Sequence, residues 1–145
     1  MNILLMDNDV MVLLFGDFYD FHKDSLKKIM LLLQQEYGEI WIPQEIRNEF
    51  YLKRNDRKRR KRLDKIKKEY PFIIDCPINV GQHEIRRING INEKDNGEVD
   101  AIIQCIKAKS QANIKFTEIR FLTRDKGATI KAGKLNVDIL KYMDL

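Results

Sequence analysis

Residues that bind zinc or form disulfide bonds are scarce in this chain. Its 145 residues contain only two cysteines, Cys76 and Cys105, and two histidines, His22 and His83, without the spacing of metal ligands. Two widely separated cysteines favour buried thiols in a reducing compartment over a disulfide framework. The sequence therefore argues against a zinc protein and predicts a cytoplasmic location.

Long apolar runs are also missing. The longest uninterrupted one, VMVLLF at residues 10–15, is far too short to span a bilayer, and the N-terminus lacks the basic start of a signal peptide. No internal repeat or low-complexity linker divides the chain. We therefore expect one domain over residues 1–145, with a hydrophobic core and no membrane partner.

Charge is unevenly distributed along the chain. Residues 53–68 hold eleven lysines or arginines against two aspartates, a local charge of +9, whereas the net charge of the whole chain is +5. The remaining residues therefore sum to −4. Such a basic stretch favours binding of a polyanion over a merely solvated helix face. The residues assigned to nucleic-acid binding here are Arg54, Arg57, Lys58, Arg59, Arg60, Lys61 and Arg62.

Short apolar segments alternate with helical patterns, which predicts an α/β fold with a parallel sheet covered by helices on both faces. About five strands are expected, at residues 2–6, 39–42, 71–75, 119–123 and 136–140. Helices are expected after residue 9, over 22–38, from Pro43 on into the basic stretch, near 82–88, from around Gly97 and at 126–133.

Acidic residues follow several of these strands. Asp7 follows the first strand and Asp125 the fourth, while Glu49 lies in the helix after the second. In parallel α/β sheets, ligands bind beyond the carboxyl ends of the strands. The helix that precedes the fourth strand opens with two more acidic residues, Glu98 and Asp100. The sequence therefore predicts an acidic cluster at one edge of the sheet.

Helix capping is the alternative explanation at each position. Asp7 can cap the first helix, Asp125 can cap the segment 126–133, and DNGE at 95–98 has the spacing of a capping box that uses Glu98. The helix dipole also favours Asp100 in a first turn. Capping explains each residue singly, whereas a bound cation explains why they recur at matching strand ends.

Clustered carboxylates without basic partners repel one another, so such a cluster usually holds a hard cation. Mg²⁺ and Mn²⁺ prefer these oxygen ligands. Either ion lowers the pKa of a bound water and steadies the leaving oxygen in phosphodiester hydrolysis. The matching strand ends of Asp7 and Asp125 predict that these two residues hold the metal.

Four segments resemble, in order, the motifs of the PIN-domain ribonucleases. ILLMDNDVMVLL resembles the opening strand and its Asp-x-Asn/Asp-Val segment, which places the first catalytic carboxylate on Asp7 and a supporting one on Asp9. WIPQEIRNEF resembles the second motif and carries Glu49. FLTRDKGA resembles the fourth, a strand ending Thr-x-Asp, and supplies Asp125 and Thr123.

The third motif is matched by DNGEVDAIIQCIKA, in which Glu98 fits one form of the family pattern and Asp100 the other. The third metal ligand therefore stays open between these two residues. The resemblance implies catalytic roles for Asp7, Glu49, Asp100 and Asp125, metal ligands among Asp7, Asp9, Glu98, Asp100 and Asp125, and a nucleic-acid contact for Thr123.

The resemblance also implies a Rossmann-like PIN domain and an endoribonuclease that uses Mg²⁺ or Mn²⁺ to cleave RNA. It implies homodimers and kinship with the VapC-type toxins of toxin–antitoxin pairs, and hence an antitoxin partner. The basic run at 53–68 is longer and more basic than the connection typical of the family.

Two other functions fit parts of the sequence. DNDVMV also resembles the Asp-x-Asp start of haloacid-dehalogenase-like phosphatases, in which Asp7 would be a nucleophile, but FLTRDK lacks the adjacent acidic pair of that family. A non-catalytic nucleic-acid-binding module would use the basic stretch alone. Cleavage of labelled RNA in manganese, lost in EDTA, separates the nuclease from such a module.

Overall fold

The computed structural model describes residues 2–16, 23–51, 56–89, 96–110, 118–124 and 138–141, together with residues 126, 130 and 133. Its five strands are β1 (Asn2–Met6), β2 (Glu39–Ile42), β3 (Ile73–Asp75), β4 (Glu118–Thr123) and β5 (Asp138–Lys141). All neighbouring strands are parallel, in the order β3-β2-β1-β4-β5. The predicted α/β class with a five-stranded parallel sheet is therefore confirmed.

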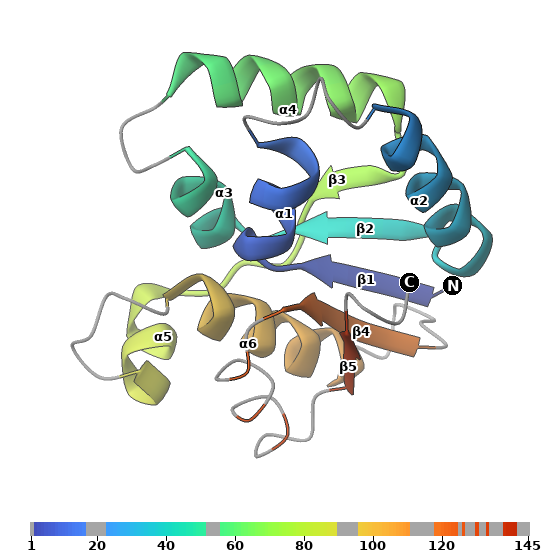
Figure 1. Cartoon of the computed structure of the whole chain (residues 1–145). Coiled ribbons are helices and arrows are strands. Elements are labelled where there is room, and N and C mark those ends of the chain that lie inside the picture. The colour runs from blue at the N-terminus through green and yellow to red at the C-terminus, as the bar shows by residue number, and fades with distance from the viewer. Residues whose placement is uncertain are drawn as a thin grey trace.

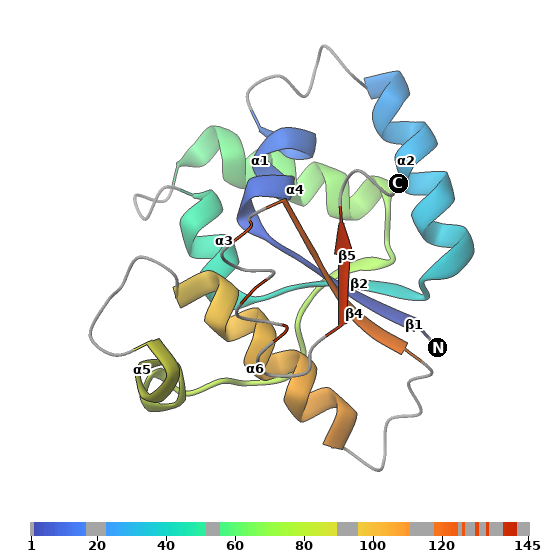
Figure 2. The ribbon, with the colours of Figure 1, turned by 60° about the horizontal axis from the view of Figure 1, so that its bottom comes forward.

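Helices cover both faces of this sheet (Figure 1). On one side lie α1 (Asn8–Phe15), α2 (Lys23–Glu36), α3 (Gln44–Phe50) and α4 (Arg57–Glu69), and on the other lie α5 (Gln82–Asn89) and α6 (Asn96–Ser110). The turned view in Figure 2 shows the same division, with α1, α2 and α4 above β1 and β2 and with α5 and α6 below them. No helix in the described part of the chain is both long and apolar enough to cross a membrane.

The core lies where the helices meet the strands. Ile3, Leu4, Leu5 and Met6 are all fully buried, because a parallel sheet with helices on both faces hides successive side chains of a central strand. Trp41 of β2 is buried in the same cluster, as its apolar surroundings in the sequence suggest. A smaller cluster of Ile85, Val99 and Ile103 packs α5 against α6.

The expectation of one helix from Pro43 into the basic stretch is wrong. α3 ends at Phe50, where the amide of Tyr51 donates to the carbonyl of Arg47 at 2.9 Å. A new helix starts after Asp56, whose carboxylate accepts the amides of Lys58 and Arg59 at 3.0 and 3.2 Å. An aspartate that binds the free amides of a first turn starts a helix rather than continuing one.

Most of the other boundaries agree with the sequence patterns, with small shifts. The third strand covers only Ile73–Asp75 rather than 71–75, and the fifth is Asp138–Lys141 rather than 136–140. The short helix expected at 126–133 falls mostly outside the described residues.

Candidate active site at the carboxyl edge of the sheet

The centre of the candidate site is Asp7, at the point where β1 meets β4. The two strands pair with Met6 opposite Leu122, so the next residues, Asp7 and Thr123, lie side by side. The amide of Asp7 donates to the carbonyl of Leu122 at 2.9 Å, and Oγ1 of Thr123 donates to Oδ2 of Asp7 at 2.7 Å. In the order β3-β2-β1-β4-β5, the strands that follow β1 are first added on one side of it (β2 and β3) and then on the other (β4 and β5). The boundary between β1 and β4 is therefore the topological switch point, where open α/β sheets bind ligands.

The carboxyl group of Asp7 is buried, and its pKa is shifted strongly. The residue is only 7% exposed, and its Oδ1 accepts the amide of Asn8 at 2.8 Å as the N-cap of α1. Burial raises the pKa of Asp7 to about 7, the hydrogen bonds from Thr123 and Asn8 oppose the rise, and the charges of Asp9 and Glu49 add to it. Repulsion from the two neighbouring carboxylates contributes to the raised pKa, but desolvation is the larger cause.

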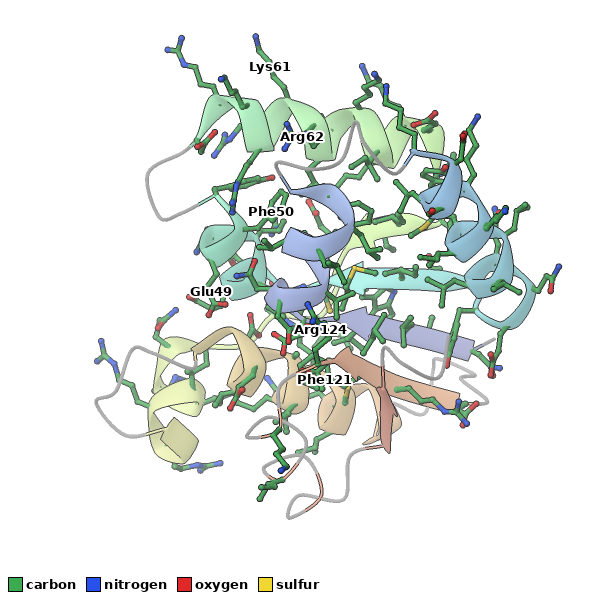
Figure 3. The ribbon with its side chains drawn as sticks, in the orientation of Figure 1. Glu49, Phe50, Lys61, Arg62, Phe121 and Arg124 are labelled. Carbon is green, nitrogen blue, oxygen red and sulfur yellow. The ribbon has the colours of Figure 1, made fainter. Side chains whose placement is uncertain are left out.

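Two further acidic side chains approach this edge from different elements. Asp9, in the first turn of α1, accepts the amide of Arg124 at 3.1 Å, which ties α1 to the end of β4. Glu49, near the end of α3, accepts the amide of Gly97 at 2.9 Å, which ties α3 to the start of α6. Figure 3 shows Glu49 and Arg124 at the side of the molecule where β1 and β4 end.

Glu98 is the next residue of α6 after the amide that holds Glu49. It is 7% exposed and lies in the first turn of its helix. Asp95, the other member of the capping box that the sequence suggests, lies outside the described residues. Within the described residues, the amide of Gly97 at the start of α6 is capped by the carboxylate of Glu49, which belongs to α3.

Asp100 has different surroundings from Asp7. Its Oδ2 accepts the amide of Glu45 at 3.1 Å, and its Oδ1 accepts Nε2 of Gln104 at 2.7 Å. Burial raises the pKa of Asp100 to about 6, and the charges that act on it are those of Glu45, which raises it, and Arg47, which lowers it. Asp100 thus caps the start of α3 and lines a small polar cavity of about 70 Å³.

The described residues do not form a complete metal centre. Within them, no group of three or more His, Cys, Asp or Glu side chains is arranged to hold a metal ion. Asp125, predicted as a ligand, and Arg54, predicted to bind nucleic acid, lie outside the described residues. The donors that do meet at this edge are carboxylates, which is the chemistry that fits Mg²⁺ or Mn²⁺ rather than a softer metal.

Two residues assigned to nucleic-acid binding make contacts within the protein. Thr123 is 1% exposed, and its hydroxyl group donates a hydrogen bond to Asp7. This hydrogen bond orients the carboxyl group of Asp7. Arg59 is 9% exposed, and its Nη1 donates to the carbonyl of Phe50 at 2.9 Å. Both side chains are therefore turned into the protein in this structure, and their assignment to nucleic-acid binding stays a prediction.

Sequence reasoning missed the groups that hold these carboxylates in place. Gln104 lies four residues after Asp100 on α6, a spacing that puts two helical side chains on one face and could have signalled the pair. No sequence signal announces the amide of Gly97 as the partner of Glu49, because the two residues are 48 positions apart.

The contact between Gly97 and Glu49 predicts a selective effect of Gly97→Ala. A Cβ at Gly97 would lie 2.5 Å from Oε1 of Glu49, so the carboxylate must move away. We expect a marked loss of the metal-dependent activity that the sequence predicts, with a smaller change in melting temperature, because only the end of a flexible side chain shifts. Gly133→Ala is the matched control, since a Cβ there meets nothing within 4 Å. Equal activity in the two variants would show that the position of Glu49 is unimportant.

The fold and the site together define a class, a parallel α/β protein with a buried carboxyl group at its switch point. No protein-family model and no curated protein sequence matches the chain. Its structure resembles a chain of the crystal structure of VapBC2 from Rickettsia felis bound to a DNA fragment from their promoter. The TM-score is 0.55 at 15% identity, and the match covers 97% of this chain and 98% of that chain. At this identity the likeness is one of fold.

Proposed function

We propose that the chain is a divalent-metal-dependent endoribonuclease that hydrolyses RNA phosphodiester bonds beside Asp7. The observation that carries the proposal is the state of this carboxyl, which is 7% exposed, lies at the switch point and has a pKa raised to about 7. The negative charges of Asp9 and Glu49 both raise this pKa further. A bound cation offsets such a concentration of negative charge and favours the ionised form of Asp7.

Of the described residues, Asp7, Asp9 and Glu98 would hold Mg²⁺ or Mn²⁺, with Glu49 as a further carboxylate held at the start of α6. Asp125 remains a predicted ligand, outside the described residues. When bound, the ion activates a water molecule and steadies the leaving oxygen. Thr123 keeps one oxygen of Asp7 fixed through its 2.7 Å hydrogen bond, and the amide of Arg124 does the same for Asp9 at 3.1 Å.

The direct test is cleavage of labelled single-stranded RNA with manganese, with and without EDTA. We expect cleavage that requires the metal, is lost in Asp7→Asn and is unchanged in Asp24→Asn, which alters an exposed aspartate in α2. Circular dichroism checks that both variants keep the fold. Full activity of Asp7→Asn would overturn the proposal. A covalent aspartyl-phosphate without RNA cleavage would favour the phosphatase alternative instead.

We also propose that the nuclease acts as the toxin of a toxin–antitoxin pair. The likeness in fold to a chain of a VapBC2 structure supports this, together with the motif resemblance in the sequence. Expression of the chain in a bacterial host should then arrest growth, whereas Asp7→Asn should not. Normal growth with the active chain present would argue for a nuclease outside such a pair.

A further inference from the structure

The basic helix α4 has two distinct faces. Arg59, Leu63 and Ile66 are its buried residues, at a spacing of four and three that marks one side of a helix. On this side the guanidinium of Arg59 lies 5.3 Å from the centre of the Phe50 ring, and Arg62 reaches the carbonyl of Phe15 at 3.4 Å. These two arginines therefore anchor α4 to α3 and α1.

The opposite face carries cations that point away from the protein. Arg57, Lys61, Lys65 and Lys68 are all exposed, and a turn of 100° per residue places them across the helix from Arg59 and Leu63. Within the described part of the chain none of the four takes part in an ion pair or side-chain hydrogen bond. Figure 3 shows Lys61 directed away from the rest of the molecule.

This arrangement is unfavourable for the helix itself. Arg57, Lys61 and Lys65 follow one another at intervals of four residues, and like charges at that spacing destabilise a helix. Asp64 is the one acidic residue in α4 before its last position, Glu69. An anionic partner along this face would remove the repulsion.

α4 also has a defined place relative to Asp7. It begins on the side of the molecule where β1 and β2 end, and then runs back over α1 (Figure 1). Its 13 residues make a row about 20 Å long. A nucleic-acid strand that leaves the carboxyl edge past α3 can therefore continue along this outer face.

We propose that the outer face of α4, formed by Arg57, Lys61, Lys65 and Lys68, binds the phosphate backbone of the RNA strand beyond the cleavage site. The assignment of RNA as the polyanion rests on the proposed function. The contacts are to phosphate rather than to bases, because the nearby ring of Tyr51 is 9% exposed and already lies under Arg60, 5.0 Å from its guanidinium carbon. Binding through phosphates positions a strand without reading its sequence.

The test compares two double variants that remove the same charge. Lys61→Gln/Lys65→Gln neutralises two cations of the outer face, and Lys27→Gln/Lys28→Gln neutralises two exposed lysines of α2. Binding of labelled single-stranded RNA is measured in EDTA over a range of salt concentrations, so that no cleavage is needed. The first variant should make the log–log salt slope shallower by about 1.4, or roughly 0.7 per lost phosphate contact, and the second should leave it near the parent value.

Steady-state cleavage in manganese then separates this proposal from the nuclease proposal. For long RNA the α4 variant should raise KM and leave kcat unchanged, because the reacting groups are intact. A shallower slope in EDTA without any cleavage would support the binding surface and reject the nuclease. An unchanged slope, or equal effects of the two double variants, would overturn the binding surface whatever the cleavage result.

Discussion

Without metal, Asp7→Asn is expected to be more stable than the parent protein at pH 8. The buried carboxyl of Asp7 has a pKa of about 7, against about 4 in an unfolded chain, so folding disfavours its ionised form. A raised pKa gives stability that is fully present below pH 4 and is lost as the pH rises through 7. The difference of three pKa units corresponds to about 4 kcal/mol, or on the order of 10 °C in melting temperature.

The asparagine variant removes this loss and keeps the helix cap, because asparagine caps as well as aspartate. The two proteins should therefore melt together near pH 4 and diverge as the pH rises toward 8, which thermal unfolding in EDTA measures. Manganese should narrow the difference by stabilising the parent alone, by about 2.7 kcal/mol at one hundred times its dissociation constant. If Asp7→Asn melts lower at pH 8 and the parent ignores manganese, Asp7 is a helix cap and not a metal ligand.

The second large effect is expected for Arg59→Ala, which should lower the free energy of unfolding by roughly 2–4 kcal/mol. The substitution removes a 2.9 Å hydrogen bond to the carbonyl of Phe50 and the contact of the guanidinium with the Phe50 ring. It also leaves a buried carbonyl without its donor, which is the larger part of the cost.

Lys61→Ala is the control for this prediction, because it removes an exposed charge from the same helix and should change stability by less than about 0.5 kcal/mol. Chemical denaturation measures both variants, and salt-dependent RNA binding adds a second comparison. We expect Lys61→Ala to weaken RNA binding more than Arg59→Ala does. An Arg59→Ala protein with the parent's stability and a loss of RNA affinity equal to that of Lys61→Ala would contradict the inward orientation of Arg59.

The alternation of apolar and helical segments was enough to predict five parallel strands, since each strand carries its own local pattern of buried residues. The same alternation predicted that Asp7 and the residues after β4 share an edge, because parallel strands end on the same side of a sheet. Strand register then decided which residue meets Asp7. Met6 pairs with Leu122, so the neighbour of Asp7 is Thr123, whose hydroxyl donates to it.

Side-chain direction on the helices was decided only by tertiary packing. The basic sequence shows that α4 is charged, but it does not show that Arg59 faces Phe50 while Lys61 faces solvent. The orientation of these two side chains depends on where α3 ends and on how Asp56 starts the next helix. Asp100 could not be placed for the same reason, since its partner, the amide of Glu45, lies 55 residues away on another helix. The sequence by itself determined the order in which the strands and the acidic residues follow one another along the chain. Long-range packing determined which of these acidic side chains reach the carboxyl edge of the sheet.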